Sequence, residues 1–129
     1  MTLNDQLANI FSQIMNAERV GKQEVSTKGS VLVKQCLALL KENGYLTEIK
    51  EVKTQQGELL EITLKGTINN CNVIKPRFAV KAYEYEKFEK RYLPAKEFGI
   101  LLVSTSQGLM THTAAKEKNL GGRLIAYCY

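Results

Sequence analysis

The sequence contains few of the residues that metal sites and disulfide frameworks require. It has three cysteines, none of them in a CxxC pair, and a single histidine, His112. An odd number of widely spaced cysteines argues against a disulfide framework, and a zinc site needs three or four converging ligands. We therefore expect neither a structural metal nor disulfides, as in a protein of a reducing cytoplasm. The cysteines are Cys36, Cys71 and Cys128.

Long apolar runs and nucleotide-binding motifs are also missing. The longest apolar stretch, Gly99 to Val103, is far shorter than the roughly 18 residues of a membrane-spanning helix. The N-terminus has no signal-peptide pattern. Neither a GxxxxGK[ST] phosphate loop nor a GxGxxG motif after a strand occurs. These absences predict a soluble protein with no cofactor, no membrane partner and no small-molecule substrate.

The composition suits a folded chain whose positive charge is segregated. The 129 residues are 44% hydrophobic and 24% charged, which is too apolar for disorder. Eighteen Lys and Arg against 13 Asp and Glu give a formal net charge of +5. Residues 1–66 contain eight of each sign, so the ten basic and five acidic residues of 67–129 supply the whole excess. The second half could meet a polyanion, and ordinary solubility charge explains the pattern equally well.

Hydrophobic periodicity predicts an α/β part in residues 1–66. A first helix should end near Ala17, and a short strand should follow at residues 23–27. Ser30 is a candidate N-cap for a second helix that ends before Gly44. Alternating residues then predict a hairpin whose turn contains Gln55, Gln56 and Gly57. The second helix should bury Leu32, Cys36, Leu39 and Leu40.

Residues 67–129 are expected to form a mainly β part with one or two short helices. Residues 73–80 predict a strand that Pro76 restricts to an edge or a bulge. Residues 83–92 favour an amphipathic helix that packs its aromatic rings, with a base-stacking platform as the alternative. A buried strand over 98–103, a helix capped by Thr111 or Thr113 and a last strand over 124–129 complete the prediction. The expected fold class is therefore α+β, with parts 1–66 and 67–129.

The segment from Ser104 to Gly108 is the most informative local feature. It follows a predicted buried strand with three hydroxyls and an amide that can donate and accept hydrogen bonds, while Gly108 permits a close backbone approach. Such groups suit the shallow minor groove of A-form RNA, which displays 2′-hydroxyls and base edges. A simple turn followed by a helix cap remains the alternative.

A glycine pair followed by a cation, Gly121-Gly122-Arg123, opens the last predicted strand. If this strand lies beside the one that enters the hydroxyl-rich segment, Arg123 stands close to that segment and can bind a phosphate. Lys75, Arg77 and Lys81 add positive charge to the same half. Alternatively, the glycine pair forms a hairpin turn and Arg123 is an ordinary solvated side chain.

Two other function classes stay open from the residues alone. A small cytoplasmic enzyme would need a concave pocket with a perturbed acid or base beside His112 and Ser104. A protein–protein adaptor would expose an aromatic patch within residues 83–92. We expect no catalytic residue, because Cys36 lies on an apolar helix face and Cys128 near the end of a strand.

The run from Tyr92 to Met110 and the segment from Gly121 to Tyr127 resemble ribosomal protein eight of the small subunit, and the similarity covers essentially the whole chain. Residues 73–78 and 93–95 look like the archaeal and eukaryotic cytosolic branch, and most like archaeal members. The resemblance implies a primary binder of 16S-type ribosomal RNA in the cytoplasmic ribosome. It also implies contact with the central domain, a role in platform assembly and neighbouring ribosomal proteins as partners.

The resemblance further implies which residues contact RNA. The main contact would be the hydroxyl-rich segment with the strand after the glycine pair nearby, and further contacts would surround the start of the second helix. Lys75 and Arg77, two basic residues of the positively charged second half, complete the expected RNA-binding residues. The expected RNA-binding residues are Ser104, Thr105, Ser106, Gln107, Gly108, Gly121, Gly122, Arg123, Lys75, Arg77, Lys28, Gly29 and Ser30.

The sequence departs from the pattern of that family in three places. Gln6 stands where the family often has Pro, and Met15 stands where it often has Arg. Val31 ends the run Lys28-Gly29-Ser30-Val31, which replaces the usual Pro-Ala-Ser-Lys. All three departures lie in the N-terminal part, and the segment at 104–108 keeps the family pattern.

Overall fold

The computed structural model describes residues 3–28, 31–55, 57–74, 77–95 and 98–129. The chain forms two compact units, Met1–Asn69 and Asn70–Tyr129. Among the described helices, none is long and apolar enough to cross a membrane. The α+β class predicted from the sequence is confirmed.

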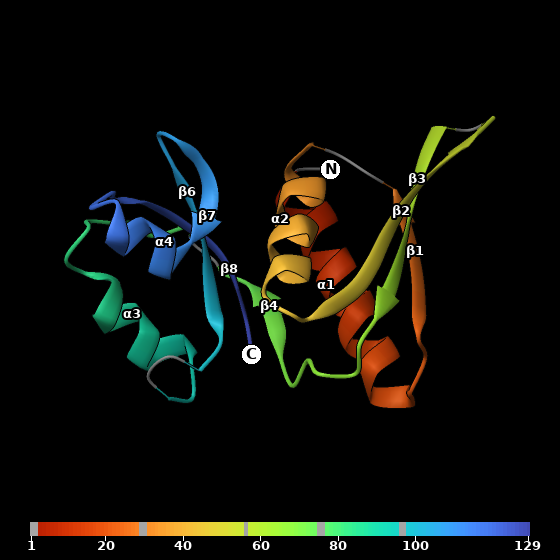
Figure 1. Ribbon diagram of the computed structural model, residues 1–129, viewed down its shortest axis with the longest axis horizontal. Helices are drawn as coiled ribbons and strands as arrows, with labels where there is room; N and C mark the ends of the chain where they lie inside the picture. The colour runs from red at the N-terminus through yellow and green to blue at the C-terminus, as the bar shows by residue number, and fades with distance from the viewer. Residues whose placement is uncertain (1–2, 29–30, 56, 75–76, 96–97) are drawn as a thin grey trace. The chain divides into compact units, whose positions relative to one another are not determined.

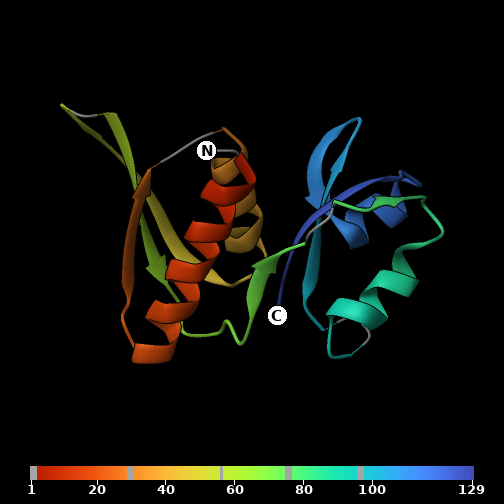
Figure 2. The ribbon, with the colours of Figure 1, turned by 180° about the vertical axis from the view of Figure 1, so that it is seen from behind.

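In the first unit, two helices lie on one side of a three-stranded antiparallel sheet (Figure 1 and Figure 2). The strand order is β1-β3-β2, so the central strand β3 pairs with both neighbours. Buried side chains of the helices and of β3 form the core. The elements are α1 (Leu3–Val20), β1 (Glu24–Lys28), α2 (Val31–Glu42), β2 (Leu46–Thr54) and β3 (Gly57–Leu64).

Helix α1 is longer than its apolar pattern predicts, because it ends at Val20 and not near Ala17. The first residue beyond the helix is Gly21, whose φ of 79° is left-handed. The N–H of Gly21 donates to the carbonyl of Glu18, and the N–H of Lys22 donates to that of Ala17. This Schellman arrangement satisfies the last carbonyls, so the glycine sets the helix end.

Helix α2 buries a different stripe from the one expected. Leu32 and Leu39 are half-buried, whereas Val33 and Leu37 are buried beside the predicted Cys36 and Leu40. Residues 33, 36, 37 and 40 follow the i, i+3, i+4, i+7 spacing of one helix face. The expectation for Cys36 as a small core residue is therefore confirmed, while the cap assigned to Ser30 lies outside the described residues.

The second unit is built on an antiparallel sheet with strand order β4-β8-β6-β7. Strand β5 pairs with β8 on the same edge as β4 but at the opposite end. All pairings are antiparallel, and apart from the β6–β7 hairpin they join segments far apart in sequence. The elements are β4 (Cys71–Val73), β5 (Ala79–Val80), α3 (Tyr85–Tyr92), β6 (Ile100–Thr105), β7 (Gly108–Thr111), α4 (His112–Glu117) and β8 (Gly122–Cys128).

Helices α3 and α4 contribute to one core cluster with this sheet. Tyr85 is fully buried, and its hydroxyl donates to the carbonyl of Leu120 at 2.8 Å. Phe88 is buried beside it, and Tyr92 stacks on Tyr127 with ring centroids 5.5 Å apart. The prediction of an amphipathic helix that packs these rings is confirmed.

Several element boundaries in this unit differ from the sequence-based expectation. The strand expected over 73–80 is two short strands, β4 and β5, with residues 75–76 outside the described part. Phe98 is 50% exposed and precedes the buried strand, which begins at Ile100. Strand β8 begins at Gly122, so the glycine pair leads into a strand and is not a hairpin turn. Thr111 caps α4 through its side chain, as one of two predicted caps.

Candidate nucleic-acid interface

The hydroxyl-rich segment forms the tip of a β-hairpin and not an open loop (Figure 1). Thr105 pairs with Gly108, which leaves Ser106 and Gln107 as a two-residue turn. Gly108 has a φ of 111°, a backbone conformation that residues other than glycine rarely adopt. The strand β7 that completes the hairpin was missed from the sequence because it is only four residues long and runs directly into α4.

The three hydroxyls of the tip have different roles. Thr105 Oγ1 donates to the carbonyl of Gly108 at 2.8 Å and accepts from the Gln107 N–H at 3.2 Å, so it holds the turn together. Ser104 and Ser106 are exposed, and their hydroxyls have no hydrogen-bond partner within the described part of the chain. The tip therefore presents two serine hydroxyls and the exposed Gln107 amide on a backbone that Thr105 makes rigid.

Strand β8 lies between β6 and β5 at this end of the sheet. Arg123 is opposite Ser104 on one side and Ala79 on the other, and Gly122 is opposite Thr105. The expectation that the last strand lies beside the strand entering the hydroxyl-rich segment is thus confirmed. Arg123 is exposed and always charged, so it offers a guanidinium one strand away from Ser104.

The glycine pair allows the strands to approach closely. A Cβ atom at Gly122 would overlap the carbonyl oxygen of Ser104 and lie 2.9 Å from Cγ1 of Val103. A Cβ atom at Gly121 would lie 2.7 Å from the carbonyl oxygen of Val80. The absence of side chains at both positions therefore brings the cation, the hairpin and the end of β5 together.

The remaining expected RNA-binding residues do not lie in the group formed by the hairpin tip, the glycine pair and Arg123. Arg77 is half-buried just before Phe78, whose carbonyl accepts the N–H of Leu124 at 3.0 Å. Lys28 is exposed at the end of β1 in the first unit. Lys75, Gly29 and Ser30 lie outside the described residues. The structure thus brings together the hairpin tip, the glycine pair and Arg123 within residues 70–129.

A comparison with protein families decides to which family this arrangement belongs. The family model for ribosomal protein S8 matches residues 5–129. The chain belongs to the ribosomal protein S8 family. Members of the S8 family are non-enzymatic structural proteins of the small ribosomal subunit, so this chain functions in translation in the cytoplasmic ribosome. Its partners are small-subunit ribosomal RNA and other ribosomal proteins.

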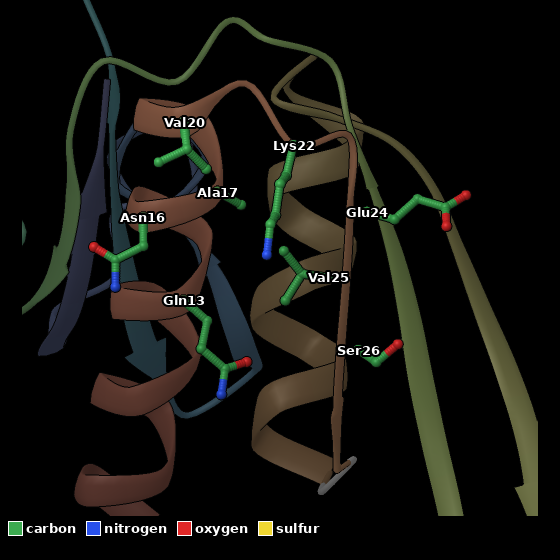
Figure 3. A pocket seen from close by; sticks show the side chains of 8 residues that line it. All are labelled: Gln13, Asn16, Ala17, Val20, Lys22, Glu24, Val25 and Ser26. Carbon is green, nitrogen blue, oxygen red and sulfur yellow. The ribbon is translucent and has the colours of Figure 1, made fainter.

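The first unit of this S8-family protein carries an open groove of about 450 Å³ between α1 and β1 (Figure 3). Val20, the last of the residues by which α1 extends beyond its predicted end, lines part of this groove. The Lys22 side chain reaches down over the groove towards Val25 (Figure 3). No sequence motif predicts this groove, which forms only because α1 and β1 lie side by side in the fold. Its lining residues are Gln13, Asn16, Ala17, Val20, Lys22, Glu24, Val25 and Ser26.

His112, the one histidine of this S8-family chain, is a structural residue. It is 3% exposed, and its Nδ1 accepts the N–H of Leu101 at 3.1 Å. Its Nε2 lies 3.2 Å from Oε1 of buried Glu89, which also binds the Lys116 ammonium. Burial lowers the pKa of His112 and Lys116 adds to this effect, while the Glu89 carboxylate opposes it. Both ring nitrogens are therefore engaged in joining α3, α4 and β6.

The two other function classes have no support at these positions. The buried His112 does not face Ser104 across a pocket, since its nitrogens point to Leu101 and Glu89. Within residues 83–92, Tyr85 and Phe88 face the core and only Tyr83 is an exposed aromatic residue, so this segment forms no exposed aromatic patch. Among the described residues there is no group of three or more His, Cys, Asp or Glu that could hold a metal ion.

Proposed function

We propose that this S8-family protein is a primary binder of 16S-type ribosomal RNA, that it contacts the central domain and that it helps to assemble the platform. One observation carries the proposal: the hairpin tip and Arg123 converge at one end of a rigid sheet. The functional division falls between residues 1–66, which act mainly as scaffold, and residues 67–129, which hold the principal contact.

The chemistry of the hairpin tip matches the minor groove of A-form RNA. That groove is wide and shallow, and it displays 2′-hydroxyls that both donate and accept hydrogen bonds. The Ser104 and Ser106 hydroxyls and the Gln107 amide have the same dual character. The hydrogen bonds of Thr105 fix the turn before RNA arrives, so little conformational entropy is lost on binding.

Positive charge has an auxiliary role in this proposal. Arg123 binds a phosphate beside the RNA minor groove, and the close strand packing that Gly121 and Gly122 permit places it next to the hairpin. A net charge of +5 neutralises only a few phosphates, so shape and hydroxyl contacts supply much of the recognition. Further backbone contacts are proposed for Lys28, Gly29, Ser30, Lys75 and Arg77.

We also assign the chain to the archaeal and eukaryotic cytosolic branch, with most similarity to archaeal members. The motifs that support this assignment are the run from Val73 to Phe78 and the run Leu93-Pro94-Ala95. The departures at Gln6, Met15 and Val31 lie in the scaffold part. They do not affect the hairpin on which the proposed function depends.

The decisive experiment removes the two presented hydroxyls and leaves the turn intact. The double variant Ser104→Ala/Ser106→Ala keeps Thr105, and we expect its affinity for a central-domain RNA fragment to fall about tenfold or more, because two hydrogen bonds are lost. A matched control is Gln55→Ala, at the corresponding position of the β2–β3 hairpin. Unchanged affinity of the double variant would remove the hairpin from the proposed interface.

Chemical footprinting tests the RNA partner itself. We expect the purified chain to protect nucleotides of the central domain in naked small-subunit ribosomal RNA, since a primary binder needs no other protein. Protection confined to another domain, or protection that requires a second ribosomal protein, would contradict the proposed role.

A further inference from the structure

A second group of side chains lies at the same end of the sheet as the hairpin tip. Val80, Gly122 and Thr105 are opposite one another on β5, β8 and β6. The residues that follow this row are therefore neighbours as well: Lys81 after β5, Gly121 before β8 and Ser106 after β6. Strands β5 and β6 flank β8 on opposite sides, so Lys81 and Ser106 lie on either side of the glycine pair.

The segment from Lys81 to Glu84 is held in a defined turn against this glycine pair. A Cβ atom at Gly121 would lie 3.2 Å from the Cα of Lys81. The Glu84 N–H donates to the carbonyl of Lys81 at 2.9 Å, and the Lys81 N–H donates to Oε1 of Glu84 at 2.9 Å. The turn therefore fixes the backbone from which the Tyr83 side chain projects.

Tyr83 projects into solvent from this turn. Its side chain is 78% exposed, although the next two aromatic residues, Tyr85 and Phe88, are buried. The Nζ of Lys81 lies 6.0 Å from the centre of the Tyr83 ring. The core does not need this ring, and the turn presents it together with a positive charge.

We propose that Tyr83 stacks on an unpaired RNA base while Lys81 binds the neighbouring phosphate, as a second arm of the RNA interface across the glycine pair from the hairpin. This inference rests on the proposed function. Aromatic side chains stack on bases that have left a duplex, and nearby cations bind the backbone of the same strand. The hairpin would bind the minor groove of paired RNA, and Tyr83 would bind a base where the pairing is interrupted. Together they select an RNA that contains a helix and an unpaired base beside it.

The surroundings of Tyr83 favour a nucleic acid over a protein as its occupant. A protein partner needs an apolar patch, whereas base stacking needs one ring. Among the described residues the other exposed large hydrophobic side chains are Val20 and Val31 in the first unit and Phe98 at the opposite end of the sheet. The exposed residues at this end of the sheet include Lys81, Arg123 and the hairpin serines.

The absence of tryptophan makes a direct optical test possible. In the full-length chain, Tyr83→Trp introduces a single tryptophan, and we expect its emission to be quenched when a central-domain fragment of small-subunit ribosomal RNA binds. Phe98→Trp is the matched control, because Phe98 is also exposed but lies beside Tyr129 at the other end of the sheet. Its emission should stay unchanged in the complex.

Affinity measurements with the same RNA complete the test. Tyr83→Phe keeps the flat ring and should bind like wild type. Tyr83→Leu removes it and should bind about 5- to 150-fold more weakly. Because the side chain is largely exposed, both variants should unfold at the wild-type temperature, which circular dichroism can verify.

The possible failures are distinguishable. If Tyr83→Leu binds like wild type while Ser104→Ala/Ser106→Ala binds weakly, the stacking inference is wrong and the proposed function stands. If the emission of the Tyr83→Trp variant changes only in the assembled small subunit, through a blue shift without quenching, a neighbouring protein covers the ring and the inference is again wrong. If the wild-type chain does not bind the fragment, the proposed function fails and the inference fails with it.

Discussion

The carbonyl oxygen of Ser104 occupies the space into which a side chain at Gly122 would project. This contact joins the start of β8 to the end of β6 and sets Arg123 opposite Ser104. The same residue that presents a hydroxyl to solvent therefore requires, through its backbone, a glycine on the neighbouring strand. The geometry of the interface and the packing of the sheet are coupled at this point.

Adding a single methyl group at Gly122 should measure this coupling. Gly122→Ala forces β8 away from Ser104 and Val103, so we expect the free energy of unfolding to fall by about 1–3 kcal/mol. Urea denaturation gives this value. Ala79→Ser, an exposed change on the facing strand β5, should stay within about 0.5 kcal/mol of wild type. Equal stability of the two variants would show that the strands can separate without cost.

The Thr105 hydroxyl should contribute to stability, unlike the two serines. The β2–β3 hairpin repeats the same device, since Thr54 Oγ1 donates to the carbonyl of Gly57 at 2.8 Å, the distance found between Thr105 and Gly108. We expect Thr105→Val and Thr54→Val each to lower the free energy of unfolding by about 0.5–1.5 kcal/mol. Thermal or urea unfolding would contradict this if Thr105→Val were as stable as wild type.

His112 should make the protein less stable in mild acid. Its pKa in the folded state is lowered, chiefly by burial, so the unfolded chain takes up the proton first as the pH falls. Stability is therefore complete above the unfolded-state pKa of about 6.5 and decreases below it, by at most about 1.4 kcal/mol per pH unit, until the folded-state pKa is reached.

The measurement is urea denaturation at a series of pH values between about 5 and 7.5. His112→Gln removes the titrating group and keeps a donor towards Glu89, so its stability should depend less on pH in this window, even if its stability at neutral pH is lower. If the free energy of unfolding changed with pH in the same way for wild type and variant, groups other than His112 would cause the acid sensitivity.

Salt dependence should separate Arg123 from the serines. Arg123→Gln removes one phosphate contact, so the slope of log affinity against log salt should become shallower by about 1. Ser104→Ala/Ser106→Ala should weaken binding with an unchanged slope, because the lost hydrogen bonds release no counterions. A full salt titration of both variants gives the two slopes. An unchanged slope for Arg123→Gln would mean that this guanidinium contacts no phosphate.

Local sequence determined much of the fold. The helical spacing of apolar residues predicted α1, α2 and α3, and alternation predicted the β2–β3 hairpin, because these signals depend on residues close together in the chain. The errors occurred where local signals were weak. The periodicity of α1 fades before Val20, and two stripes of α2 are almost equally apolar, so only the packing against the sheet selected Val33 and Leu37.

The sequence by itself also determined the segregation of charge and the family motifs at residues 92–110 and 121–127. The tertiary structure alone decided that Ser104–Gly108 is a hairpin, that Thr105 is committed to its turn and that Arg123 and Lys81 flank the same sheet end. It alone also placed His112 against Glu89. The hairpin is local, but its four-residue strand β7 gives too weak a signal to be recognised in the sequence. The other placements join residues far apart in the chain through strand register and buried pairs, and no local propensity encodes which distant segment fills the neighbouring space.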